Sequence, residues 1–186
     1  MRKVMYGMSV SLDGYIESTE GNLDWSLIDE ELHQHFNDLE SQIDVELYGR
    51  VLYETMAAFW PTADEDPSHP PYVVEYARIW KSKPKIVFST TLDQVGWNST
   101  LVRGNIAEEV GKLKRQPGKY LSVGGPGLAS SFMRLGLIDE FWLYYTPVIL
   151  GGGKPMFPSL KNKIELQLME TKKFGSGVTL LRYQRR

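Results

Sequence analysis

The chain has 186 residues, a net charge of −2 and an isoelectric point of about 6.0. This balance gives no strong field for a polyanion, so we expect no nucleic-acid partner. Cysteine is absent, which excludes disulfides and thiolate metal sites and fits a cytoplasmic location. Neither a signal peptide nor an apolar run long enough to cross a bilayer is visible, so we expect no membrane partner. The length predicts one domain over residues 1–186.

The first half of the chain alternates apolar runs with helical segments. A strand over Val4–Val10 ends in the turn Ser11-Leu-Asp-Gly14. Acidic residues that suit a helix start predict a helix over 28–41. Pro61–Pro71 carries four prolines and predicts a loop. Further strands are predicted over Val45–Tyr48 and Lys85–Ser89, and helices after Gly49 and over 72–80.

The second half continues the alternation and then changes character. Asn105 and Glu108 form a capping-box-like start for a helix to about residue 115. Strands are predicted over Thr100–Arg103, Tyr120–Val123 and Ile138–Thr146, with a helix after Pro126, and a final hairpin over Ile164–Met169 and Val178–Tyr183. The fold class predicted is α/β, a three-layer α/β/α arrangement whose mixed, mostly parallel sheet is closed by a C-terminal antiparallel hairpin.

Two strand-to-helix junctions carry glycine. One is Gly124-Gly125-Pro126-Gly127, where Pro126 suits the first helical position; the other is Gly49-Arg50-Val51, which adds a cation. Free N–H groups and the helix dipole favour an anion at such a junction. The Rossmann fingerprint is excluded, because the run lies two-thirds along the chain rather than after the first strand.

Other strand ends carry polar groups suited to a ligand. These are Asp13 after the first strand, the hydroxyl cluster Ser89, Thr90 and Thr91, and Arg103. In open α/β sheets ligands bind at the carboxyl ends of strands, so the set is stronger evidence than any one member. The alternatives stay open: Asp13 also fits an ordinary Asp-Gly turn, and Arg50 a surface salt bridge.

With these motifs the chain resembles the dihydrofolate reductase superfamily, and most closely its branch related to the C-terminal reductase domain of the bacterial riboflavin deaminase/reductase. The motifs that carry the likeness are Ser11–Gly14, Tyr48–Glu54, Val123–Gly127, and Thr146–Gly153 with Phe157. The resemblance implies that NADPH is the hydride donor. It implies phosphate contacts at Gly49, Arg50, Val51, Gly124, Gly125, Pro126 and Gly127, and a 2′-phosphate near Ser89, Thr90, Thr91 and Arg103. It also implies a cis peptide bond between Gly124 and Gly125.

Departures from the superfamily limit the substrate. Folate enzymes carry one carboxylate on the first helix, whereas here Asp29, Glu30 and Glu31 compete for that place, or simply charge the helix start. Tyr15 stands where the riboflavin reductases usually have Lys. We take Asp13 and Glu30 as candidate proton donors to the substrate. No metal is expected, since His33 and His35 point to different helix faces.

These observations predict an NADPH-dependent oxidoreductase that acts on a small heterocyclic or carbonyl substrate. The nearest known activity is that of the pyrimidine reductase of riboflavin biosynthesis, 5-amino-6-(5-phosphoribosylamino)uracil reductase. The alternatives are a dihydrofolate reductase and a non-catalytic NADPH-binding protein. A small-molecule substrate is the expected partner, and a homodimer is left open.

Overall fold

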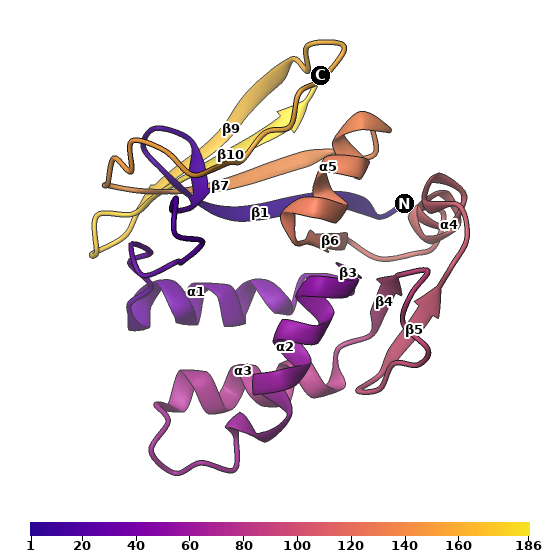
Figure 1. Cartoon of the computed structure of the whole chain (residues 1–186), viewed down its shortest axis with the longest axis horizontal. Coiled ribbons are helices and arrows are strands. Elements are labelled where there is room, and N and C mark those ends of the chain that lie inside the picture. Colours follow the sequence, from indigo (N-terminus) through magenta and orange to yellow (C-terminus); the bar gives the residue numbers. More distant parts are fainter.

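A computed structural model describes residues 1–186, and an eight-stranded sheet forms its centre (Figure 1). The strand order is β5-β4-β3-β6-β1-β7-β10-β9, and only β10 runs against the others. The strands of this sheet are β1 Lys3–Ser11, β3 Ile43–Gly49, β4 Lys85–Phe88, β5 Ser99–Val102, β6 Tyr120–Gly124, β7 Glu140–Thr146, β9 Leu166–Lys173 and β10 Thr179–Arg185. The predicted mixed, mostly parallel sheet with a C-terminal antiparallel hairpin is confirmed, and all five strands expected in its main part are there.

Five helices cover the sheet, and their bounds are α1 Glu30–Glu40, α2 Arg50–Ala63, α3 Pro71–Ser82, α4 Ile106–Lys114 and α5 Pro126–Arg134. Figure 1 shows α1 and α3 running side by side on one side of the sheet. Local sequence explains two starts. The Asp29 side chain accepts from the N–H of Leu32, and the Asn105 side chain accepts from the N–H groups of Ala107 and Glu108. No helix is both long and apolar enough to cross a bilayer.

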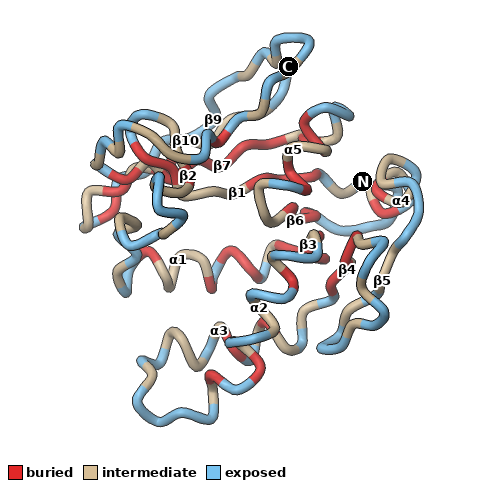
Figure 2. The backbone as a smooth tube through the Cα atoms, viewed as in Figure 1, coloured by how far each residue is buried: buried red, intermediate tan, exposed pale blue.

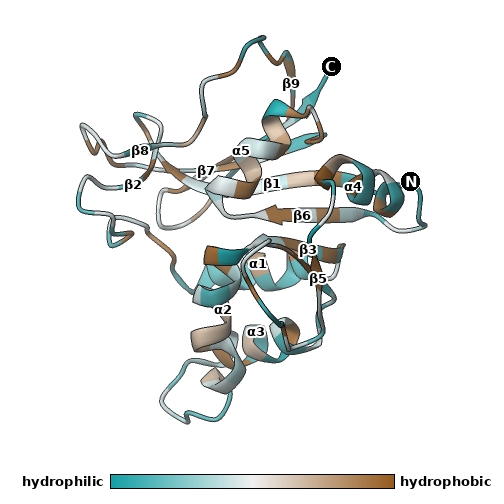
Figure 3. Ribbon diagram, turned by 45° about the vertical axis from the view of Figure 1, so that its right-hand side comes forward, coloured by the Kyte–Doolittle hydropathy of each residue, from teal (hydrophilic) through white to brown (hydrophobic).

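The sheet buries different residues on its two faces. On one face, β3 and β6 place Leu47 and Leu121 against Val110 of α4 and Phe132 of α5. Alternation along β3 sends Glu46 and Tyr48 to the other face, which α1, α2 and α3 cover. Figure 2 shows that buried residues gather in the central strands, while the loop between α2 and α3 is exposed. In Figure 3 the hydrophobic colour follows β3 and β6.

Two predicted loops contain regular structure. α2 extends to Ala63 and includes Pro61, so the loop expected from Pro61 begins later. Within the Gly-rich segment 147–158, the short β8 Lys154–Pro155 pairs with β2 Tyr15–Glu17 in a separate two-stranded sheet. Both differences arise because tertiary contacts outweigh the local preference of proline and glycine.

One buried carboxylate joins the strands on the C-terminal side of the sheet. Glu140 is 1% exposed and accepts hydrogen bonds from Lys3 Nζ at 2.9 Å, Trp142 Nε1 at 3.0 Å and Arg182 Nε at 3.0 Å. Burial alone would raise the pKa of this carboxyl, but the hydrogen bonds and the Arg182 charge bring its pKa below the ordinary value. Glu140 therefore stabilises the contact of β1 and β10 with β7 as a charged group.

Candidate functional site

The two glycine junctions lie next to each other at the carboxyl ends of neighbouring strands. β3 and β6 are parallel neighbours, with Tyr48 paired to Gly124, so α2 and α5 begin from adjacent strand ends. Gly49 and Gly125 are the N-caps of these helices, and neither has a side chain that caps the free N–H groups. Two uncapped helix N-termini side by side form a site suited to a pyrophosphate-sized anion.

Gly125 is required by the shape of its junction. Its φ is +83°, and a Cβ built on it would lie 3.2 Å from Cβ of Leu52 in α2. A Cβ on Gly124 would lie 2.5 Å from Leu52 Cδ2. The predicted cis bond between these glycines is wrong, since the structure contains no cis peptide bond. The chain reverses through the positive φ of Gly125 instead, which a glycine adopts without steric cost.

Arg50 and Val51 occupy the first turn of α2, and both are exposed. Arg50 Nη1 donates to Glu54 Oε2 at 2.8 Å, an i,i+4 ion pair in which each side chain is 47% exposed. The surface salt bridge considered from the sequence is therefore present. Such a pair contributes little to stability, about 0.3–0.5 kcal/mol, and Arg50 can exchange it for a stronger anionic partner.

The hydroxyl cluster and Arg103 are brought together, as the strand ends predicted. Ser89 Oγ accepts from the N–H of Thr91 at 3.2 Å and of Leu92 at 3.1 Å, and Thr90 is exposed beside them. Arg103 Nη2 donates to the carbonyl of Leu92. This hydrogen bond ties the loop after β4 to the end of β5 and leaves the rest of the guanidinium exposed.

Asp13 acts as a structural link in this structure. Its carboxylate accepts hydrogen bonds from Ser11 Oγ at 2.7 Å and from the N–H groups of Leu150 at 3.1 Å and Gly151 at 2.8 Å. These bonds, that of Ser11 first, hold the pKa of Asp13 below its ordinary value. Asp13 thus fastens the end of β1 to the Gly-rich loop as an ionised group, which is the opposite of a poised proton donor.

The acidic residues at the start of α1 also have other partners. Asp29 is the N-cap, and Glu31 Oε2 accepts from the N–H of Gly175 at 2.7 Å. Glu30 is exposed and borders a polar surface hollow together with His35 and Lys172. Neither Glu30 nor Asp13 borders the main cavity described next, so neither predicted proton donor lies on its wall.

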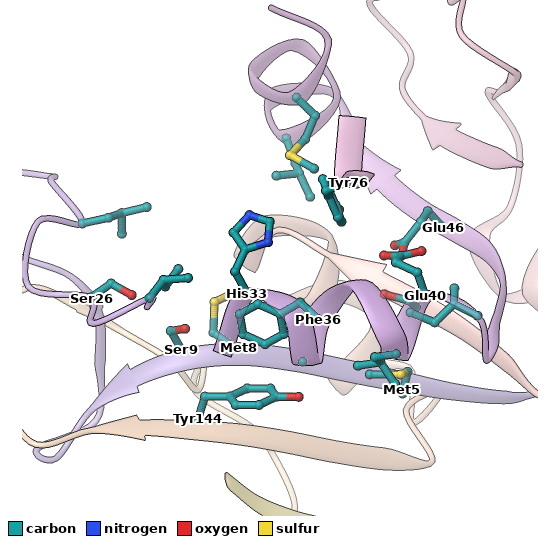
Figure 4. Close-up of a pocket in the computed structure, with 18 of the residues that line it drawn as sticks. Met5, Met8, Ser9, Ser26, His33, Phe36, Glu40, Glu46, Tyr76 and Tyr144 are labelled. Atoms are coloured by element: carbon teal, nitrogen blue, oxygen red, sulfur yellow. The ribbon is translucent and has the colours of Figure 1, made fainter. Parts of the chain in front are cut away.

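A cavity of about 530 Å³ lies between the sheet and α1, α2 and α3 (Figure 4). Fifteen of its 22 lining residues are hydrophobic, and the segment before α1 contributes Trp25 to the wall. The sheet contributes large side chains to the wall, among them Met5 and Tyr144, and also three small residues, Gly7, Ser9 and Ser122. At the three small residues a ligand can come closer to the strand backbone than elsewhere on this wall.

His33, from the first turn of α1, points into this cavity in Figure 4. Its ring packs against Tyr72 and Tyr76, with centroids 4.8 and 5.9 Å away, and its buried Nδ1 has no hydrogen-bond partner. Burial lowers the pKa of this imidazole. The lowered pKa favours the neutral imidazole at physiological pH.

Two carboxyl groups meet on the cavity wall, Glu40 from the end of α1 and Glu46 from β3 (Figure 4). Their side chains are nearly buried, with the residues 7% and 5% exposed. Burial raises the pKa of both groups, and the neighbouring charge of Glu40 raises that of Glu46 further. Burial and the charge of Glu40 thus favour the protonated form of Glu46, whereas the charge of Lys83 favours the ionised form of Glu40.

Two lysines stand behind the carboxyl pair, outside the cavity wall. Lys83 Nζ donates to the carbonyls of Glu40 at 2.6 Å and Ile43 at 2.8 Å, and lies 3.3 Å from Glu40 Oε2. Lys85 is buried beside Glu46 on the neighbouring strand and donates to the carbonyls of Trp80 and Lys83. Burial lowers the pKa of Lys85 to about 8.

Three residues of the cavity wall, His33, Glu40 and Glu46, were not predicted from the sequence, although Glu46 left a signal there. Glu46 is a lone carboxylate inside the otherwise apolar strand Val45–Tyr48, and a buried charge in a strand needs a partner or a function. Glu40 lies at a helix end and reads as an ordinary surface residue. His33 was weighed only as a metal ligand, and the helix pattern does not show which face meets the cavity.

Comparison with known proteins agrees with this architecture. Residues 2–180 match the family described as the RibD C-terminal domain. The uncharacterized protein YyaP of Bacillus subtilis is 39% identical, over 98% of this chain and 94% of its own. A crystal structure of a putative riboflavin biosynthesis protein from Shewanella sp. PV-4 is 25% identical, with a TM-score of 0.76 over 99% of both chains.

The fold is also that of dihydrofolate reductase. The enzyme from Enterococcus faecalis, solved in complex with NADP(H), has a TM-score of 0.64 and is 15% identical over 99% of this chain and 96% of its own. At that identity the likeness concerns the fold alone. Together with the family match, it confirms the superfamily and the branch that the sequence motifs indicated.

Proposed function

This chain belongs to the RibD C-terminal domain family, and we propose that it is a reductase that uses NADPH to reduce a small heterocyclic or carbonyl substrate. One observation carries the proposal. Two uncapped helix N-termini, at Gly49 and Gly125, lie side by side at the carboxyl ends of β3 and β6, and Tyr48 and Leu52 beside the first of them line an apolar cavity. A dinucleotide needs an anion site and an apolar slot of this kind.

The residues present fit NADPH. The junctions at Gly49 and Gly125 would hold its pyrophosphate, with Arg50 free to leave Glu54, and the group at Ser89 and Arg103 would meet the 2′-phosphate. When bound, the cofactor supplies the hydride. Complexes with NADP(H) in the structurally similar dihydrofolate reductase support the same assignment.

The chain's own task is then to orient the substrate, exclude water and deliver a proton. Asp13 and Glu30 were the donors expected from the sequence, but their carboxylates lie outside the cavity. Glu46 and His33 are on its wall instead. Burial raises the pKa of both Glu40 and Glu46, which favours a protonated carboxyl, and this pair is our first candidate for the donor.

The test pairs Arg50→Ala with Glu54→Gln. Removing Arg50 should weaken NADPH binding about 10- to 150-fold, the equivalent of about 1.5–3 kcal/mol for a charge-assisted hydrogen bond. Glu54→Gln frees Arg50 from its ion pair and should leave the affinity equal or higher. Isothermal titration calorimetry measures both.

Turnover is read as the loss of reduced-nicotinamide absorbance over a panel of pyrimidines, pteridines and carbonyl compounds. An unchanged dissociation constant in Arg50→Ala would contradict the phosphate role. Tight NADPH binding with no oxidation across the panel would instead favour a binding protein without turnover.

A further inference from the structure

We propose that the free edge of the central sheet, strand β9, pairs with β9 of a second copy of this chain, so that one continuous sheet runs through a two-fold symmetric dimer. The inference goes beyond the proposed function, because it needs neither a cofactor nor a substrate. The two-fold axis passes through Thr171, and Glu170 of each copy lies opposite Lys172 of the other.

The two edges of the sheet differ in length. The sheet ends in β5 on one side and in β9 on the other. β5 has four residues, whereas β9 has eight, contains no proline and exposes seven of its residues to solvent. Figure 1 shows β9 at the border of the sheet. An edge strand presents unpaired N–H and C=O groups, and a long one can bind a strand of another chain.

A bulge limits the part of β9 that can pair regularly. It leaves Met169 without a partner on β10, and this side chain is 51% exposed. Regular pairing with β10 is found over the residues that follow, 170–173. With the axis at Thr171, Met169 lies close to Lys173 of the second copy, whose aliphatic stem can cover it.

The charges of this stretch lie on one face of the sheet. Glu170 and Lys172 are two residues apart, so their side chains point to the same side. This is the side of α1, since Lys172 borders the surface hollow together with Glu30 and Glu31 of that helix. Both signs of charge therefore occur next to the edge, as a surface that binds its own copy requires.

The order of these charges favours one register. Residues directly opposite in an antiparallel pair share a face, so a two-fold axis places one residue opposite its own copy. An axis through Glu170 or Lys172 would bring like charges together, which is destabilising. An axis through Thr171 instead forms the Glu170–Lys172 pair twice.

Neither charged group has a strong partner within its own chain. Glu170 Oε2 lies 3.4 Å from Arg182 Nη1, a long contact, and its side chain is 48% exposed. Lys172 Nζ lies 4.6 Å from the centroid of the Phe174 ring and has no carboxylate within ion-pair distance. Both can therefore pair across the edge without breaking a good contact.

The size of the contact predicts a weak dimer. Two paired edges bury less than the roughly 1,200–2,000 Å² of a standard interface. We expect a dissociation constant of about 1–100 µM. High salt should weaken the dimer, because the two ion pairs are exposed.

The experiment follows the mass of the full chain by sedimentation equilibrium, without cofactor. The proteins are wild type, Glu170→Lys, Lys172→Glu and the control Glu65→Lys, which makes the first charge change at an exposed residue outside β9. Glu170→Lys leaves two lysines facing two lysines, and Lys172→Glu two glutamates facing two glutamates. Opposite charges then meet only in a mixed dimer.

We expect wild type and Glu65→Lys to dimerise, and each β9 variant to do so about tenfold or more weakly. An equimolar mixture of the two β9 variants should recover the dimer. Hydrogen exchange read by mass spectrometry should be slower over residues 166–173 in the dimer than in the monomer, because the free amides of the edge become bonded.

A wild type that stays monomeric up to about 1 mM would overturn the proposal. A dimer that both β9 variants retain would place the interface elsewhere, and a mixture that stays monomeric would reject the register. Unchanged exchange over β9 would reject strand pairing. The substituted positions are exposed, so the variants should fold, and thermal unfolding checks this. Were one unfolded, the salt dependence and the exchange of wild type would still decide.

Discussion

Gly125→Ala tests whether the turn into α5 depends on a backbone conformation that only glycine adopts well. Gly125 has φ +83° and ψ 135°, outside the regions open to residues with a Cβ. The new methyl would also lie 3.2 Å from Leu52 Cβ, closer than side chains normally pack, so α2 or α5 must shift by a few tenths of an ångström.

The magnitude follows from three contributions. Holding alanine in this region costs about 1–3 kcal/mol. The contact with Leu52 adds to the loss, because both partners belong to packed helices. Alanine also restricts the unfolded chain, which offsets about 0.4–1 kcal/mol. The net expectation is a loss of about 1–3 kcal/mol in the free energy of unfolding. NADPH affinity should fall as well, since the amides of the junction are displaced.

Urea unfolding followed by circular dichroism measures the loss, and Gly127→Ala is the matched control. Gly127 lies in the first turn of the same helix, and a Cβ there would meet no atom within 4 Å. We therefore expect Gly127→Ala to stabilise the protein by about 0.5–1 kcal/mol, the helical preference of alanine over glycine. If Gly125→Ala were as stable as wild type, or both alanines behaved alike, the reasoning about the turn would be refuted.

Two further predictions concern charged groups. Arg103→Ala should weaken binding of NADPH but not of NADH, by about tenfold or more for one lost phosphate contact; parallel titrations would show equal losses if Arg103 merely holds Leu92. Glu140→Gln should destabilise the protein at pH 7. Because the folded pKa of Glu140 is lowered, its contribution is present above about pH 4.5 and is lost as the pH falls through the folded value. Urea unfolding should therefore show the two proteins converging in acid, and a constant difference would contradict this.

The fold could be predicted because its signals are local. Runs such as Tyr120–Val123 have the composition of buried strands, and Asn105 carries its own capping chemistry, so each element is encoded by a few neighbouring residues. It was also predictable that Ser89 and Arg103 lie at the same end of the sheet, since each follows one of two neighbouring parallel strands; Arg103 there donates to the carbonyl of Leu92. These inferences need no knowledge of long-range packing.

The cavity could not be predicted in the same way. Its carboxyl pair joins Glu40 at a helix end to Glu46 in a strand, and only the packing of α1 on the sheet makes them neighbours. Asp13 shows a second limit of prediction from sequence. An Asp-Gly turn at a strand end has the look of a catalytic carboxylate, yet a loop more than 130 residues later uses it as an anchor. Sequence reveals which groups are unusual, but not which partners reach them.

The small residues on the sheet side of the cavity are places where this chain could change its ligand. Gly7, Ser9 and Ser122 are on central strands whose opposite faces hold the core, and a larger side chain at any of them would fill cavity space rather than displace packed neighbours. A Cβ on Gly7 would make only ordinary van der Waals contact, at 3.5 Å from Met5 Cε. A single substitution at one of these positions can therefore change the accepted ligand at little cost in folding stability. Two copies of such a gene can differ in ligand specificity while both proteins keep the same fold.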